Sequence, residues 1–431
     1  MKLKRTYHAI LLLAALMTVY GCGNLYTGDE VPVIPDTPGN PDEPDHPMEY
    51  EEVPVMLTFT DPSYTVFTRG QGSFDDKSTV LGNRNWSNAR FYVYAFRSDN
   101  PTGMTFATTR KDDKEICLID GSTQSTPDMQ HGRLARLNEN DGGAFFSWID
   151  DSEPLYYSSL GQINPFNFFA YYIDDAIVSN FQRTAEDIKF DVEIDGTQDL
   201  LGAVASPTAE QLANIEALTD ENERNNVKKY LYSTYTAHRN FHPVLAMKHY
   251  MSRLKFQMFP GGKENDSIYV QSVKVESLTK GTFTVAAKDT ATIGVHFPND
   301  GAKKDLILCD TTGLPLQRDS FLVKMTEADK LESYVYNRHY VKLGEDALLT
   351  VPAESYKLTI ELMQCYADGR RNETYMAEYK ALTVPGGFKP GTQYTIRIAV
   401  FGLEEIEVNV VVTPWAEGGN VDLEPDDFFE Q

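Results

Sequence analysis

Alternating carboxylates near the middle of the chain are the first residues whose types and spacing could do chemistry. Asp191, Glu193 and Asp195 occupy every second position, as do the side-chain ligands of a calcium-binding loop. Such a loop needs a bidentate glutamate at its twelfth position, where this chain has Gly202. Val192 and Ile194 fill the positions between, which is the pattern of a half-buried strand. The sequence therefore predicts a strand here and no metal site.

No arrangement of nucleophile, base and acid indicates catalysis. His249 has no nucleophile motif near it, so we expect a hydrogen-bonded structural histidine. Carboxylate pairs abound among 63 Asp and Glu residues, so they neither support nor exclude a glycosidase site. Cys117, Cys309 and Cys365 are too scattered for a metal site, and whether Cys309 and Cys365 form a disulfide is left open. We expect a protein that is not an enzyme and binds no cofactor.

The start of the chain has the parts of an export signal. Basic residues precede an apolar stretch at 9–17 that is too short to span a bilayer. A small residue followed by Cys22 comes shortly after it, which resembles the lipobox of bacterial lipoproteins. Residues 1–21 are thus predicted to be a signal peptide. Cys22 would become the acylated N-terminus of a protein anchored by lipid in the outer membrane.

Residues 22–52 are predicted to form a stalk. Proline stands at every third position from 32 to 47, and polyproline II has three residues per turn. All these prolines would line one face of an extended rod of about 60 Å. Mutual repulsion of the acidic residues stiffens it. We interpret the stalk as a spacer above the membrane, with a disordered linker as the alternative.

The composition of the body predicts strands and argues against nucleic acid as a partner. The net charge is −24, so a phosphate backbone would be repelled. From residue 53 onward, short runs of β-branched and aromatic residues alternate with turn residues, which predicts an all-β fold. The runs at 91–96 and 166–172 are apolar on both faces and fit central strands. Alternation at 394–400 and 406–412 predicts a hairpin with one wet face.

Two further segments interrupt this pattern. Residues 206–236 are predicted to be a surface helical insertion, in which Ser206 caps the helix and Pro207 takes its first position. Residues 245–258 fit a helix or a strand, and the strand needs one phase slip. We expect a β-bulge near Ser252 to produce that slip.

The order of motifs along residues 50–420 resembles the fimbrillin and Mfa-like proteins of the Bacteroidales. After the lipoprotein start, the motifs are FYVYAF at 91–96, DLLGA at 199–203, MKHYMSRL at 247–254, FKPGTQYT at 388–395 and VTPWAEGG at 412–419. The resemblance implies two transthyretin-like antiparallel β-sandwich domains. We place the division between 240 and 295, as domains at 53–290 and 291–431.

The resemblance also implies a function. In this family a protease cleaves after an arginine beyond the first strand, and an extended strand from the next pilin subunit fills the groove. The matching position is Arg69, followed by Gly70. We therefore expect a fimbrillin-like pilus subunit or cell-surface adhesin that assembles by donor-strand exchange, with a host protein or glycan as a further partner.

Two alternatives stay open at this point. Cleavage at Arg69 would remove the stalk and the lipid, so a retained anchor or a stalked adhesin is one alternative. The other is a surface lipoprotein that binds glycans for uptake and does not polymerise. Clustered exposed Trp and Tyr residues in one groove would support the second.

Overall fold

The computed structural model of the 431-residue chain describes most of the predicted body. The described residues are 53–60, 89–99, 105–140, 143–149, 155–157, 163–260, 267–308, 322–323, 341–365, 373–400 and 406–414. The predicted signal peptide, Cys22, the stalk, Arg69 and Gly70 lie outside these ranges. The pairing of Cys309 with Cys365 stays a prediction, because Cys309 also lies outside them.

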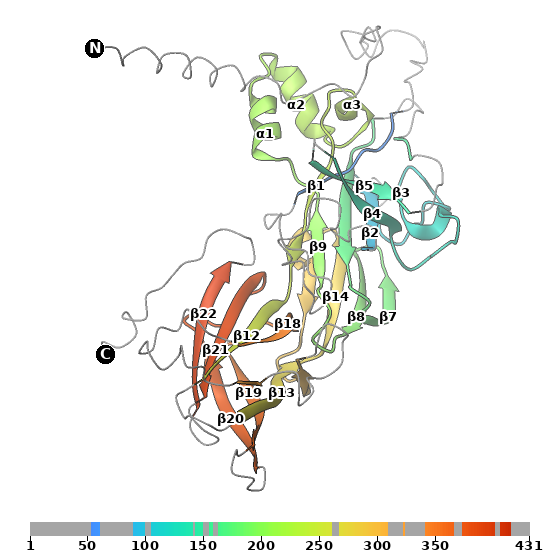
Figure 1. Ribbon diagram of the computed structural model, residues 1–431. Coiled ribbons are helices and arrows are strands. Elements are labelled where there is room, and N and C mark those ends of the chain that lie inside the picture. Colours follow the sequence, from blue (N-terminus) through green and yellow to red (C-terminus); the bar gives the residue numbers. More distant parts are fainter. Residues whose placement is uncertain are drawn as a thin grey trace, which may run out of the picture.

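The described strands form two pairs of sheets, and the first pair lies next to the helices (Figure 1). Its larger sheet has β1 (Thr58–Thr60), β2 (Phe91–Arg97), β3 (Cys117–Ile119), β4 (Arg133–Asn140), β5 (Gly143–Trp148), β6 (Phe166–Tyr172), β9 (Leu201–Val204), β10 (Val244–Ala246) and β11 (Lys248–His249). Its smaller sheet has β7 (Ile177–Arg183), β8 (Asp187–Glu193), β14 (Lys280–Ala287) and β15 (Gly294–His296). The orders are β10-β1-β5-β4-β2-β6-β9-β11, with β3 beside β2, and β15-β14-β8-β7.

The second pair lies at the opposite end of the molecule (Figure 1). One sheet has β12 (Ser252–Pro260), β18 (Val341–Thr350), β21 (Thr392–Val400) and β22 (Ile406–Pro414), in the order β18-β12-β21-β22. The other has β13 (Ser267–Leu278), β16 (Lys303–Ile307), β17 (Leu322–Val323), β19 (Ser355–Cys365) and β20 (Glu373–Thr383), in the order β16-β13-β19-β20 with β17 beside β13. The antiparallel pairing of β21 with β22 confirms the predicted hairpin.

The larger sheet of the first pair closes on itself. β10 stands at one end of its strand order and β11 at the other, yet a single residue, Met247, separates them in the chain. The N–H of Ser206, just beyond β9, donates to the carbonyl of Val244 in β10 at 3.3 Å. β1 is therefore one strand of a closed sheet, between β10 and β5. We call this closed sheet the closed wall.

β2 shows why both faces of this sheet are apolar. Phe91, Val93 and Ala95 point to a core inside the closed wall, while Tyr94 and Phe96 join a second core shared with the smaller sheet. All five side chains are fully buried. The prediction of a central strand with two apolar faces is confirmed, and so is the all-β fold class.

The helical insertion is confirmed, but its detail differs from the prediction. The helices are α1 (Ala209–Glu216), α2 (Glu221–Lys229) and α3 (Thr234–Ala237). Thr208 caps α1 in place of Ser206, because Thr208 and Gln211 form a reciprocal capping box. Asp220 accepts bonds from the N–H groups of the next turn, so a second helix begins there. No helix in the described ranges is long and apolar enough to cross a membrane.

Residues 245–258 are extended, and the phase slip has another cause than a bulge at Ser252. The chain leaves the larger sheet of the first pair after His249 and enters the second pair at Ser252 as β12. The register shift against β18 falls later, between Leu254 and Phe256. The change of alternation between Met251 and Leu254 thus arises where the chain crosses from one sheet to another.

The chain crosses between the two pairs of sheets three times. β12 and β13 belong to the second pair, β14 and β15 return to the first, and β16 goes back to the second. Within the described residues, sheet membership therefore interleaves, whereas the sequence predicts one division, between domains at 53–290 and 291–431. That the two pairs fold as separate domains stays a prediction.

Candidate functional site

The segment that contains β1 is hydrogen-bonded along both of its edges. On one edge, Val55 N–H donates to Leu155 at 2.7 Å, and the carbonyl of Leu57 accepts from Phe146 N–H at 3.1 Å. On this first edge, β1 also pairs antiparallel with β5. On the other edge, β1 runs parallel to β10, with Thr58 opposite Val244. The neighbours of the segment therefore define a slot that one extended strand fills.

Side chains along the segment alternate between the core and the solvent, as in a strand with one buried face. Val55 and Leu57 are 9% and 3% exposed and belong to the core inside the closed wall, while Met56 between them is 51% exposed. Pro54 lies opposite Tyr156 in an antiparallel bridge whose hydrogen bonds are made by Val53 and Val55, so the missing N–H of Pro54 costs no bond. An occupant of the slot needs apolar side chains at alternate positions.

The far edge of the slot is short. β10 has three residues, and the preceding Pro243 accepts bonds at its carbonyl from the N–H of Thr58 at 3.1 Å and from its hydroxyl at 3.2 Å. Sequence reasoning left the residues from Leu245 onward open between a helix and a strand, and it did not predict the parallel pairing with β1, because alternation within one segment does not reveal its partner. The one available signal was the buried pair Val244 and Leu245 directly after that proline.

Two motifs that are 44 residues or more apart in the chain meet beside the slot. His249 of β11 lies opposite Leu201 of β9, and its Nδ1 is 2.7 Å from Asp199 Oδ2. Both side chains are buried, at 4% and 0% exposure. Asp174 extends the cluster by accepting from the N–H of Asp199 and the hydroxyl of Tyr172. The prediction of a structural, hydrogen-bonded histidine at this position agrees with that geometry.

Tyr250, the residue after His249, packs against the same 199–203 motif. Its N–H donates to the carbonyl of Leu200 at 2.9 Å, and its ring packs edge-on against Phe283. A Cβ at Gly202 would lie 2.9 Å from the Tyr250 hydroxyl oxygen, and one at Gly294 would lie 3.2 Å from its ring. Burial raises the pKa of Tyr250 to about 12. The glycine of the 199–203 motif makes room for this ring.

A third motif meets the chain where it crosses to the second pair of sheets. Gly391 N–H donates to the carbonyl of Met251 at 2.9 Å, and the Ser252 hydroxyl donates to the carbonyl of Lys389 at 2.8 Å. Arg253 is fully buried and donates to Gln393 Oε1 at 2.8 Å. The motifs at 199–203, 247–254 and 388–395 thus build one junction between the two pairs.

Of the alternating carboxylates, Asp191 and Glu193 lie on β8, and all three have protein partners. Asp191 accepts from Asn180 and Thr282, and hydrogen bonds from Lys304 and Lys280 hold the pKa of Glu193 below its usual range. Asp195 lies just beyond the end of β8 and accepts from the hydroxyl of Thr197 at 2.6 Å. Among the described residues, no cluster of His, Cys, Asp and Glu could hold a metal ion. These carboxylates therefore bind protein groups in the structure.

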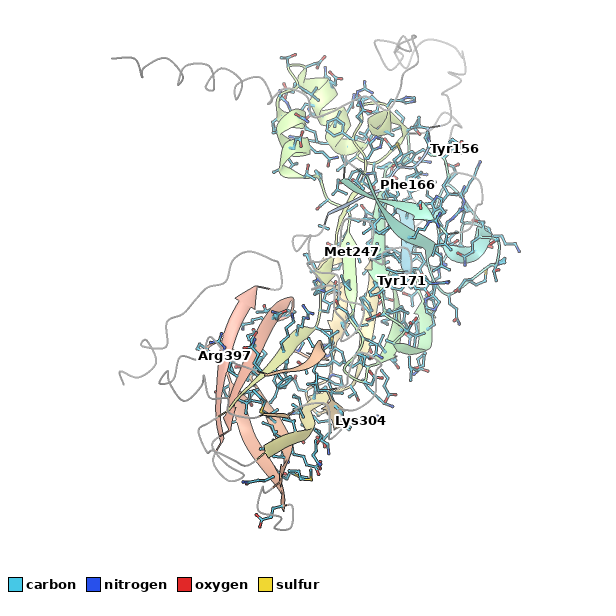
Figure 2. The ribbon with its side chains drawn as sticks, viewed as in Figure 1. Tyr156, Phe166, Tyr171, Met247, Lys304 and Arg397 are labelled. Atoms are coloured by element: carbon cyan, nitrogen blue, oxygen red, sulfur yellow. The ribbon has the colours of Figure 1, made fainter. Side chains whose placement is uncertain are left out.

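Figure 2 places the labelled side chains along the long axis of the molecule. Tyr156 and Phe166 lie near the helices, Met247 and Tyr171 lie midway, and Lys304 and Arg397 lie in the second pair of sheets. Met247 is fully buried where the larger sheet closes. The slot of β1 is thus at the helical end, remote from the second pair.

A mainly antiparallel fold of packed sheets with a short helical insertion defines the class of β-sandwich proteins. A family model described as fimbrillin-like matches residues 102–415. Because this match spans well over half of the chain, the protein belongs to the fimbrillin-like family. The resemblance indicated by the sequence motifs is confirmed. Membership supports a pilus or adhesin role at the cell surface, among other fimbrial subunits.

Solved structures of cell-adhesion and fimbrial proteins are similar over most of the chain. One is described as a cell adhesion protein of Bacteroides uniformis, with 12% identity, a TM-score of 0.42, and coverage of 84% of this chain and 98% of that one. Another, from Bacteroides ovatus, has 12% identity, a TM-score of 0.39, and coverage of 86% and 99%. The fimbrial anchor protein Mfa2 of Porphyromonas gingivalis has 12% identity, a TM-score of 0.31, and coverage of 84% and 98%. No curated protein sequence matches the chain.

Proposed function

We propose that the protein is a fimbrial subunit or cell-surface adhesin that assembles by exchange of the strand in the β1 slot. The observation that carries this proposal is the pairing of residues 53–60, the segment that contains β1, along both edges, with Val55 and Leu57 buried in the core of a closed sheet. Removing β1 would open the wall and expose that core. A strand from another chain would restore both the hydrogen bonds and the apolar contacts.

Maturation and anchoring complete the proposal. Cleavage after Arg69, before Gly70, would release β1 from the rest of the chain. Acylation of Cys22 would hold the uncut precursor in the outer membrane, with the proline stalk as a spacer. An uncut, lipid-anchored subunit would keep β1 in place and serve as an anchor or a stalked adhesin. We assign the protein no catalytic role.

Intact mass of the protein taken from the outer membrane, before and after treatment with a trypsin-like protease, tests the proposal. We expect the mass to begin at acylated Cys22 before cleavage and at Gly70 after it, with ladders of oligomers on SDS gels. Arg69→Ala should abolish the ladders, whereas Lys77→Ala, a change of another basic residue in the same segment, should leave them intact. Persistence of the acylated chain without ladders would refute polymerisation and leave the anchor.

The glycan-binding alternative finds no specific support in the described residues. Trp148 is the tryptophan among them, and the guanidinium of Arg133 covers its ring at 4.8 Å from the centroid. A sugar-stacking platform needs an open aromatic face. We therefore place strand exchange first.

A further inference from the structure

β10 is the edge of the slot that has the fewest hydrogen bonds to the rest of the sheet. Within the described residues its ladder partner is β1 alone, and Thr58 supplies two further bonds to Pro243. When β1 leaves, β10 loses these bonds, although an incoming strand needs the same edge to pair with. Another element must hold residues 243–246 in place if the slot is to keep its shape.

Two hydrogen bonds that do not involve β1 tie the helical insertion to this edge. The side-chain amide of Gln211 in α1 donates to the carbonyl of His242 at 3.0 Å, and Ser206 N–H donates to the carbonyl of Val244 at 3.3 Å. The same amide is fixed from behind, because its Oε1 accepts from Thr208 N–H at 3.1 Å. Gln211 thus connects the start of a helix to the start of β10.

The helices also give this edge a packed support. Ile215 of α1, Val227 of α2 and Phe241 form a small core, with 1%, 0% and 8% exposure. Tyr232 and Ala237 belong to the core inside the closed sheet, together with Val55 and Leu57. Phe241 lies two residues before Pro243, so the helical core holds the chain directly at the entrance to β10.

We propose that the helical insertion, acting through Gln211, is a brace that keeps β10 in position after β1 has left. It thereby offers a preformed edge to the incoming strand of a second copy. The inference rests on the proposed function, because it assumes a slot that empties and refills. The occupant is an extended strand with apolar residues at alternate positions, as at Val55 and Leu57, running parallel to β10.

The test uses the full chain with a specific protease site introduced within residues 61–88. After cleavage and release of the N-terminal fragment, a fluorescent peptide of residues 53–60 is titrated against the protein. Gln211→Glu keeps the acceptor that caps α1 but replaces the donor to His242, so we expect peptide binding about tenfold weaker. Leu212→Ala, on the same helix and 48% exposed, is the matched control and should bind like the wild type.

Thermal unfolding of the uncut variants separates the brace from general stability. The inference expects a Tm close to that of the wild type for uncut Gln211→Glu, since β1 then holds β10. Ile215→Val, which removes one methylene group from the helical core, should also weaken binding of the peptide without unfolding the protein. Equal affinity for wild type, Gln211→Glu and Ile215→Val would overturn the brace alone. A cleaved wild type that binds no peptide would overturn the proposed function and the brace with it.

Discussion

Asp199 and His249 form a buried pair that depends on both partners. Removing the carboxylate leaves a buried ring nitrogen without its hydrogen-bond partner, so Asp199→Ala should lower the free energy of unfolding by about 1–3 kcal/mol. Urea unfolding of the full chain measures the change. Glu216→Ala breaks an ion pair with Lys228 whose side chains are 62% and 48% exposed, and it should change the stability far less. Equal effects of the two substitutions would contradict a special role for the buried pair.

Two histidines should make the fold sensitive to mild acid. Burial lowers the pKa of His131 and of His242 below that of a free imidazole. Below about pH 6.5 the unfolded chain therefore binds protons that the folded chain does not, and unfolding is favoured. This stability is complete above pH 6.5, falls as the pH drops, and levels off below the folded pKa. Unfolding free energies between pH 7 and 5 test it.

The matched variant for this pH dependence is His131→Gln with His242→Gln, which removes both titrating groups. It should flatten the decrease between pH 7 and 5. Hydrogen bonds from Thr109 lower the pKa of Asp112, and hydrogen bonds from Lys304 and Lys280 lower that of Glu193. These carboxylates therefore take up protons only at a lower pH than the histidines and do not contribute to the decrease between pH 7 and 5. An unchanged slope in the double variant would assign the acid sensitivity to other groups.

At the scale of elements, the residues that lead into β1 should contribute stability through their inward face, at Val55 and Leu57. Leu57→Ala removes a side chain that is 3% exposed, and it should cost about 2 kcal/mol or more. Met56→Ala, at the adjacent outward position with 51% exposure, should cost less than about 0.5 kcal/mol. Denaturant midpoints of the two uncut variants decide the point. Similar losses at both positions would mean that the segment leading into β1 does not alternate between the core and the solvent.

Local patterns explain which elements the sequence could predict. The hairpin of β21 and β22 follows from alternation on each side of a nearby turn, and the insertion follows from capping and helix-forming residues. β10 and β11 have three and two residues, and β9 pairs with β11 across more than 40 residues of chain. Periodicity cannot reveal such short, distant pairings. The slot itself was predictable only through the family resemblance, which pointed to the first strand.

Among the described residues, the two pairs of sheets touch at separate places along the molecule, and two of these places are joined by hydrogen bonds or ion pairs. One is the crossing at residues 249–253, which Gly391 and Lys389 bind. The other is the turn after β8, where the carbonyl of Gly196 accepts from Leu349 N–H of β18 at 2.9 Å. An ion pair from Lys304 to Glu193, at 2.7 Å, lies beside it. Contacts at separate points resist rotation of one pair against the other better than a single connection does.

Gly196→Ala tests that coupling. Gly196 has φ of 100°, and a Cβ there would lie 2.9 Å from Leu348 Cδ1 and 3.2 Å from Leu306 Cβ, both in the second pair. Gly386 has φ of 76°, but the nearest atom to its Cβ would be 3.9 Å away, so Gly386→Ala carries backbone strain without the clash. We expect Gly386→Ala to lose about 1 kcal/mol and keep one calorimetric transition. Gly196→Ala should lose about 1–3 kcal/mol more and split the unfolding into two transitions, because its overpacking separates the two pairs. A single transition in both variants would show that the crossing at 249–253 couples the pairs without the Gly196 turn.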